Sequence, residues 1–189
     1  MIEHNKFVKN LEKDFTTAVP ISDGVVTIRL MFDVDADAYA AGADDALVKR
    51  FAHLPLEKYT PQVVSDMIQG VITDGLRDRT LAVLTIADAS SDSFLGSLVI
   101  FDVKQDEAEI GYWVTPTHRG HGVSERALML GVEIARILGL KKLCARTVRE
   151  NPASLKSLLK AGFSQVSEAQ FYKTPSGKTE MSICFYVEL

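Results

Sequence analysis

The sequence has no long hydrophobic run and no surplus of positive charge, and each absence excludes a class of protein. No apolar run approaches the ~20 residues that a transmembrane helix needs, and residues 1–6 lead into polar sequence without the apolar middle of a signal peptide. We therefore expect a cytoplasmic protein with no membrane partner. The net charge of −4 argues against nucleic acid as a partner, because non-specific binding depends on a surplus of lysine and arginine.

Side chains that bind metals or form disulfides are also scarce: the chain has two cysteines and four histidines. Cys144 and Cys184 stand in apolar, strand-like stretches, so we interpret both as buried, reduced thiols without a catalytic role. His118 and His121 share a turn, but no acidic or thiol side chain stands close to them in the sequence. We predict no metal site.

The residues that are present have the composition of a globular domain. The 189 residues are 47% hydrophobic and 24% charged, as is typical of a folded protein. This length fits a single hydrophobic core. We predict one domain over residues 1–189, in which residues 1–20 form a polar lead-in.

Residue patterns predict strands in alternation with helices. Stretches of β-branched and apolar residues between turn-forming residues predict strands at 25–32, 80–87, 94–103, 108–114, 142–148, 164–172 and 180–187. Alanine content, proline at a first helical position and an apolar stripe predict helices at 33–51, 61–76, 122–138 and 152–162. This order predicts a mixed α/β fold that ends in a hairpin.

The most informative segment for chemistry is the turn Arg119-Gly120-His121-Gly122-Val123-Ser124, between an expected strand and an expected helix. The first amides of a helix have no partner within it and lie at the positive end of its dipole. Glycine lets an anion approach the backbone closely, so the turn predicts a pyrophosphate site. Arg119 and His121 are expected to add side-chain donors. A purely structural connection between strand and helix is the alternative.

This turn resembles motif A of the GNAT acyltransferases. The family pattern, Arg/Gln-x-x-Gly-x-Gly/Ala, is met by Arg119, Gly122 and, as a small replacement for the last residue, Ser124. Residues 151–163 resemble motif B of the same family. The resemblance implies a GNAT fold, which is a mixed, mostly antiparallel, twisted sheet of about seven strands flanked by helices. In that fold the fourth and fifth strands splay apart.

The resemblance also implies a co-substrate, acetyl-CoA. Its pantetheine arm would lie between the splayed strands and pair with the backbone of Tyr112, Trp113 and Val114, on the fourth strand. A core or dimer-surface role is an equal alternative for the side chain of Trp113.

Many GNAT enzymes carry a tyrosine on the motif B helix that protonates the departing thiolate. The position that aligns with it here is Leu158, which cannot donate a proton. The Asn-x-x-Ser stretch formed by Asn151 and Ser154 is instead similar to the ribosomal-protein N-terminal acetyltransferases, the Rim-type branch. That resemblance assigns Asn151 to cofactor binding and Ser154 to catalysis. A helix cap and a solvent-facing serine are the alternatives.

Glu109 is our candidate for the general base, because it precedes the aromatic pair Tyr112-Trp113 on the same strand and could take a proton through water. A cross-strand partner of a basic residue is the alternative. Glu168 and Tyr172 are weaker candidates for this role.

Together these residues predict an N-acetyltransferase in which a primary amine attacks the thioester of acetyl-CoA directly. The acceptor is a protein N-terminus, a small amine or an amino acid. An α-amine asks less of a base than a lysine amine does, because its pKa lies nearer to 7. The alternatives are a non-catalytic acyl-CoA sensor or structural subunit, and a phosphate-binding module of unrelated fold. A homodimer is plausible for so small a domain.

Overall fold

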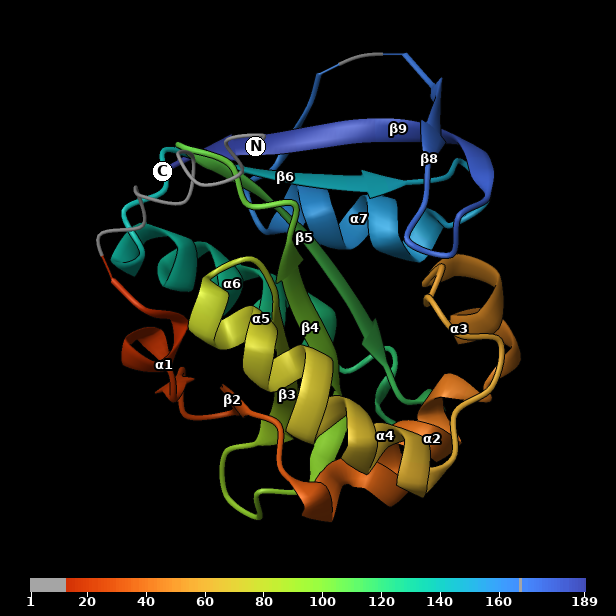
Figure 1. Ribbon diagram of the computed structural model, residues 1–189. Helices are drawn as coiled ribbons and strands as arrows, with labels where there is room; N and C mark the ends of the chain where they lie inside the picture. The colour runs from red at the N-terminus through yellow and green to blue at the C-terminus, as the bar shows by residue number, and fades with distance from the viewer. Residues whose placement is uncertain (1–12, 167) are drawn as a thin grey trace, which may run out of the picture.

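The computed structural model describes residues 13–166 and 168–189, and one twisted sheet organises them (Figure 1). The strand order is β1-β2-β3-β4-β5-β6-β9-β7, and β8 pairs with β9 outside this path. Among these described pairs only β5 and β6 run parallel. The strands are β1 (Ile21–Ser22), β2 (Val26–Leu30), β3 (Ala82–Asp88), β4 (Phe94–Phe101), β5 (Glu107–Val114), β6 (Lys142–Thr147), β7 (Ser164–Gln165), β8 (Gln170–Lys173) and β9 (Thr179–Glu188).

The mixed, mostly antiparallel sheet expected from the sequence is therefore confirmed, with nine strands instead of about seven. The two extra strands arise at short segments. β1 is a two-residue strand that pairs with β2. The single strand expected at 164–172 is two short strands, β7 and β8, which pair with different parts of β9.

Helices cover both faces of the sheet. In Figure 1, α4 and α5 lie in front of β3 and β4, and α6 lies on the opposite face. The helical segments are α1 (Phe15–Ala18), η1 (Asp33–Asp35), α2 (Ala36–Ala43), α3 (Ala46–Phe51), α4 (Pro61–Met67), η2 (Ile68–Ile72), α5 (Thr73–Asp78), η3 (Pro116–His118), α6 (Val123–Ile137) and α7 (Pro152–Lys160). Of the expected lead-in at 1–20, residues 1–12 lie outside the described residues, and α1 packs on α6.

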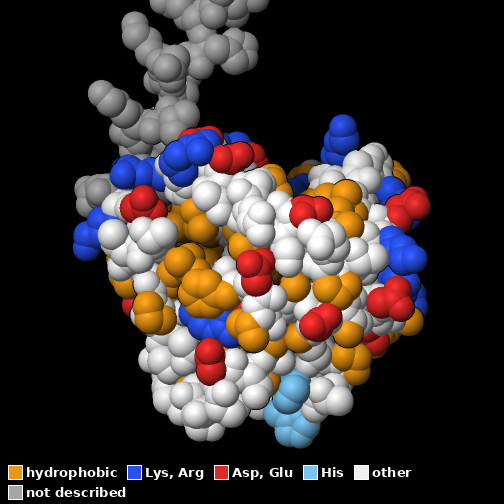
Figure 2. Space-filling view, turned by 60° about the horizontal axis from the view of Figure 1, so that its bottom comes forward, with side chains coloured by type: hydrophobic (Ala, Val, Ile, Leu, Met, Phe, Trp, Pro, Cys, Tyr) orange, Lys and Arg blue, Asp and Glu red, His pale blue; other side chains and the backbone are white. Residues whose placement is uncertain are grey.

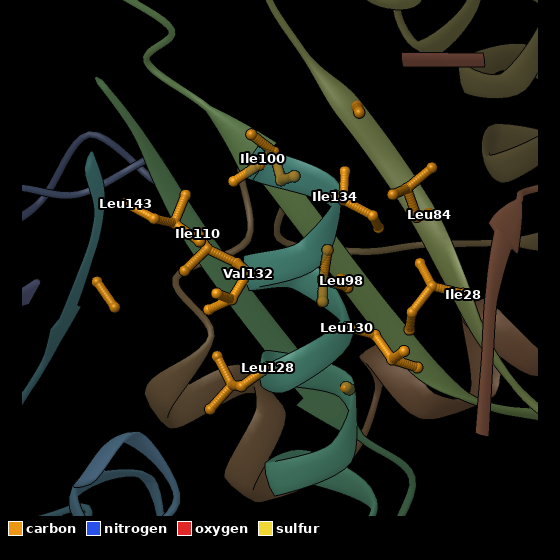
Figure 3. Close-up of a cluster of buried hydrophobic side chains, with 14 of the residues drawn as sticks. Ile28, Leu84, Leu98, Ile100, Ile110, Leu128, Leu130, Val132, Ile134 and Leu143 are labelled. Atoms are coloured by element: carbon orange, nitrogen blue, oxygen red, sulfur yellow. The ribbon is translucent and has the colours of Figure 1, made fainter. Parts of the chain in front are cut away.

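Alternation along the strands divides the buried residues into two cores. On one face, the apolar stripe of α6 packs against β2, β3, β4 and β5, with Leu98 and Ile110 beneath the helix (Figure 3). Gly131 permits this close packing, because a Cβ there would lie 2.4 Å from Cδ1 of Ile110. The core of the other face gathers around Tyr39 and Trp113, whose ring centroids are 5.2 Å apart. Each face of the sheet therefore packs against a different set of helices.

The helical stretch expected at 33–51 is present, but it is divided into η1, α2 and α3. The side chain of Asp45 accepts hydrogen bonds from the N–H groups of Leu47 and Val48, and this cap starts α3 as a new helix. The alanine content that suggested one helix carries no information about such a break. The helix expected at 61–76 continues to Asp78 but contains the π-helical turn η2, with non-helical angles at Gly70.

The parallel pair of strands, β5 and β6, separates along its length. The strands pair only where Glu107 to Glu109 meet Lys142 to Cys144. Beyond this point they diverge, as Figure 1 shows, while β5 continues to Val114 and β6 to Thr147. The expected splay of these two strands is confirmed, and among the described residues it leaves one edge of β5 without a strand partner from Ile110 onward.

The surface carries charges of both signs. Figure 2 shows lysine, arginine and acidic side chains scattered over the coloured part of one face, with hydrophobic side chains gathered between them. Within the described residues, no helix combines the length and the apolar character that crossing a bilayer requires.

Candidate active site

The divergence of β5 and β6 opens a cleft of about 800 Å³. Its walls come from both faces of the sheet. One part is formed by α6 and α7, and the other by α3, α4, η2 and the strands β3 and β4. Since the cleft passes between the two strands, it can hold a long ligand from one face and a second ligand from the other.

The predicted phosphate turn lies at one end of this cleft. Arg119, Gly120, Gly122, Val123 and Ser124 all line the cleft, whereas His121 does not. Gly122 is the N-cap of α6 with a φ of 77°, in the left-handed region that favours glycine. No side chain among the described residues caps α6, so its first amides are available to a ligand. This arrangement fits a pyrophosphate bound by backbone donors.

The Arg119 side chain is held by protein groups instead of facing the turn. Its Nε donates to the carbonyl oxygen of Val114 at 3.0 Å, and its Nη2 pairs with Oδ1 of Asp45 at 2.5 Å. The hydrogen bond from Arg119 lowers the pKa of the Asp45 carboxyl. Arg119 therefore joins the turn to the end of β5 and to the start of α3.

Two cations that the sequence analysis missed line the same end of the cleft. They are Lys156 and Lys160, on α7, and Nζ of Lys160 lies 3.0 Å from Oε2 of Glu125. Their spacing of four residues places both on one side of the helix. That spacing was the available signal, but it acquires meaning only once α7 is known to face the turn.

The free edge of β5 follows the turn. Residues Tyr112 to Val114 pair with β4 on one side, and no strand of the described chain pairs with them on the other. The Trp113 side chain is only 7% exposed and contacts Tyr39, Phe94 and α2, which is the core alternative considered from the sequence. Its backbone remains at the open edge, where an extended ligand can pair with it.

The start of α7 lies across the cleft from this edge. Asn151 caps the helix by accepting a hydrogen bond from the N–H of Ser154 at 3.2 Å, and both residues line the cleft. The Tyr112 hydroxyl donates to Oγ of Ser154 at 3.4 Å. Burial raises the pKa of Tyr112, against the hydrogen bonds with Ser154 and Ser157, so the phenol stays protonated. Leu158 is buried in the core.

The sequence predicted a role for Tyr112 only through its backbone, whereas its side chain brings a phenol hydroxyl into the cleft. Alternation along β5 places Tyr112 and Trp113 on opposite faces of the sheet. That pattern could have directed the Tyr112 side chain to the face that carries α7.

Glu109 lies at the point where the strands separate. Its two carboxylate oxygens accept hydrogen bonds from Nε and Nη2 of Arg146 at 2.8 and 2.6 Å, so the cross-strand partner considered from the sequence is present. Burial raises the pKa of Glu109, although Arg146 opposes this shift. Both side chains line the cleft.

The weaker candidates from the sequence lie apart from one another. Tyr172 lines the cleft and stacks on Arg146, with 4.9 Å between Cζ and the ring centroid. Glu168 pairs with Arg149 at the surface and does not line the cleft.

Cys144 and Cys184 are free thiols on the neighbouring strands β6 and β9, two positions out of register. Burial raises the pKa of Cys144 to about 11 and also raises that of Cys184. In the described part of the chain, no three His, Cys, Asp or Glu side chains gather as a metal site would require.

Comparisons with known proteins agree with this geometry. A family model described as an acetyltransferase (GNAT) domain matches residues 26–164. A structure of Mycobacterium smegmatis RimJ in complex with CoA-disulfide is 22% identical, covers 87% of this chain and 82% of its own, and has a TM-score of 0.75. The ribosomal-protein-S5-alanine acetyltransferase from Vibrio fischeri is 16% identical, with coverages of 90% and 96% and a TM-score of 0.72.

The spermidine N-acetyltransferase from Vibrio cholerae, in complex with CoA and spermine, is 14% identical, with coverages of 88% and 96% and a TM-score of 0.71. At such low sequence identities, the TM-scores show that these proteins share the fold of this chain. A search of curated protein sequences found no match. Because the family model spans most of the chain, and because the splayed strands and the glycine turn are in place, the protein belongs to the GNAT acetyltransferase family.

Proposed function

We propose that the protein is an N-acetyltransferase that transfers the acetyl group of acetyl-CoA to a primary amine. The observation that carries this proposal is the continuity of the cleft. One cavity is lined by the phosphate turn, by the free edge of β5 and by Glu109. Two ligands that enter from opposite faces of the sheet would therefore meet between β5 and β6.

The residues of the cleft suit each step of a direct transfer. The amides of residues 122–124 would bind the pyrophosphate, and the edge of β5 would pair with pantetheine. A backbone N–H near Val114 would stabilise the oxyanion that forms when the amine attacks the thioester carbonyl. Glu109 would take the proton that the amine loses, directly or through water.

The collapse of the tetrahedral intermediate breaks the C–S bond and releases a thiolate. Ser154 would donate a proton to this thiolate, and the Tyr112 hydroxyl would supply a proton to Ser154 in turn. This pair would take the role of the tyrosine that many relatives carry at the position of Leu158. Tyr112 would bring a phenol to the cleft from β5 instead of from α7. Both hydroxyl groups carry their proton at pH 7, as a proton donor must.

The rival function is a sensor that binds acyl-CoA without turnover. The buried Leu158 favours it, because this side chain cannot donate a proton at the position where many relatives carry a donor. The single domain over residues 1–189, the cytoplasmic location and the homodimer stay predictions.

The test combines binding with turnover. Calorimetry with CoA and with acetyl-CoA should show one site per chain. Release of thiol and the product mass should then show transfer to members of a panel of primary amines. Binding without transfer to any amine would support the sensor, and no binding at millimolar CoA would exclude both functions.

A further inference from the structure

The acceptor end of the cleft, beyond Glu109, is an apolar chamber. Its walls are Leu47, Phe51, Met67, Val71, Val99 and Phe101. Cross-strand pairing places Phe101 opposite Glu109 and Val99 opposite Gly111, so the chamber begins directly beside the carboxylate. Gly111 carries no side chain, and Val99 and Phe101 pack close over it, since a Cβ there would lie 3.2 Å from Cγ1 of Val99 and 3.8 Å from Cε1 of Phe101.

The kinked segment η2 forms part of one wall of this chamber. Met67 precedes η2, and Val71 lies within it. Both line the cleft, and Val71 keeps 53% of its surface exposed although it is apolar. The helix is kinked at this point, where Gly70 has non-helical backbone angles. The wall therefore presents apolar surface that no described residue covers.

No unpaired carboxylate lines the cleft within residues 13–166 and 168–189. Among the described residues that line the cleft, the carboxylates are Glu109 and Glu125, and each is paired with a cation, Arg146 and Lys160. His53 also lines the cleft, near Lys178 and Glu180, and burial lowers its pKa, which favours the neutral imidazole. A second ammonium group on the acceptor would thus meet apolar side chains without a carboxylate, which is a costly burial.

The ion pair of Glu109 and Arg146 complements a particular acceptor. Arg146 uses Nε and Nη2 for Glu109, and its Nη1 meets no acceptor within residues 13–166 and 168–189. A carboxylate oxygen has a second lone pair for an ammonium group, and the free Nη1 suits a carbonyl oxygen. An α-aminoacyl group carries an ammonium and a carbonyl on one carbon atom, together with its side chain.

We infer that the acceptor is an α-aminoacyl compound with an apolar side chain, which occupies the chamber, and that it is not a polyamine. This inference rests on the proposed function. The amine would face Glu109 and the carbonyl group would face Nη1 of Arg146. The shared chemistry has two sources, the N-terminus of a peptide and a small amino-acid derivative.

The first experiment compares kcat/KM for leucinamide, glycinamide, spermidine and a hexapeptide that begins with leucine. Leucinamide should exceed glycinamide by about 10-fold or more, the discrimination that buried methylene groups provide, and spermidine should fall below glycinamide. A hexapeptide that exceeds leucinamide would identify protein N-termini as the source, and the reverse order would identify small derivatives. Equal rates with leucinamide and glycinamide, or a preference for spermidine, would overturn the inference.

A binding measurement separates this inference from the proposed function. Calorimetry on the protein loaded with CoA should show tighter binding of leucinamide than of glycinamide even if no acetyl transfer occurs. Absence of transfer with this ranking of affinities would refute only the proposed function. Transfer without this ranking, in binding and in kcat/KM, would refute only the inference.

Val71→Glu tests the chamber itself, because this exposed residue can change without loss of core packing. The new carboxylate should lower kcat/KM for leucinamide about 10-fold and raise it for spermidine. Met129→Glu is the matched control, since Met129 is 52% exposed on α6 and does not line the cleft. An unchanged ratio of leucinamide to spermidine in Val71→Glu would contradict the inference.

Discussion

The two ends of the cleft are built in different ways. The phosphate end consists of consecutive residues, 119–124, and its donors are backbone amides at the start of α6. The acceptor end consists of side chains from α3, α4, η2, β4, β5 and β6. A site made of backbone depends on local conformation and tolerates many side chains, whereas a site made of distant side chains changes with each substitution. The first end therefore suits a constant ligand, and the second can specify a particular one.

The largest effect should follow from a change in backbone conformation at the phosphate end. Gly122→Val forces a β-branched residue into the left-handed region and blocks the approach of an anion. We expect CoA affinity to fall about 100-fold, equivalent to the loss of one or two charge-assisted hydrogen bonds. Calorimetry measures this, with Gly24→Val as the control, because Gly24 has a φ of 88° and does not line the cleft. Equal losses of affinity in both variants would argue against a backbone phosphate site.

Removal of the proton donor should separate binding from chemistry. Ser154→Ala should lower kcat about 10- to 100-fold while CoA affinity stays close to normal, because the donated proton matters chiefly in the transition state. Tyr112→Phe should lower kcat less, and the double variant should be no slower than Ser154→Ala if Tyr112 acts through the serine. Steady-state kinetics with calorimetry measure both quantities. A parallel loss of kcat and of CoA affinity would mean that Ser154 serves only to form the start of α7 and has no part in proton transfer.

A third variant addresses the junction of the two ends. Glu109→Gln cannot accept a proton, so at pH 7 the rate should fall about 10-fold, to what the neutral fraction of an α-amine supports by itself. Since burial raises the pKa of Glu109, the wild-type rate should rise with pH through a value above that of an ordinary carboxyl. The pH–rate profile of the variant should lack this limb and approach wild type near pH 9. Glu168→Gln, whose arginine partner lies outside the cleft, should keep the wild-type profile.

The smallest effect should come from residues that belong to neither end. Cys144 and Cys184 do not line the cleft, and their raised pKa values keep both thiols protonated. The double variant Cys144→Ser, Cys184→Ser should keep kcat and CoA affinity within about 2-fold of wild type. A folded double variant that binds CoA but has lost activity would assign a thiol to the chemistry.

The same contrast explains how much the sequence could predict. Gly120 and Gly122 are local signals, because the turn and the helix start are formed by neighbouring residues. The splayed strands followed from a family resemblance that includes this turn. The bidentate pair of Glu109 and Arg146 depends on the register between β5 and β6, which no single segment contains. The chamber depends in addition on the break at Asp45 that starts α3, within a run that is rich in alanine.

The roles of Trp113 and Tyr112 were predicted only in part, for the same reason. Their strand was predicted, and so was the role of its backbone. The partners of the two side chains, a core on one face and Ser154 on the other, come from α2 and α7. A strand's own sequence shows alternation, but it does not show which helix covers each face.

The ion pair of Arg119 and Asp45 joins the two ends mechanically. Arg119 belongs to the phosphate turn, and Asp45 caps α3, the helix that brings Leu47 and Phe51 to the chamber. A ligand that orders the turn then also orders the first turn of α3, and linkage requires that each ligand raise the affinity of the other by the same factor. Acetyl-CoA would thus tighten the binding of the acceptor, and the acceptor would tighten the binding of acetyl-CoA. Asp45→Ala should remove this cooperativity.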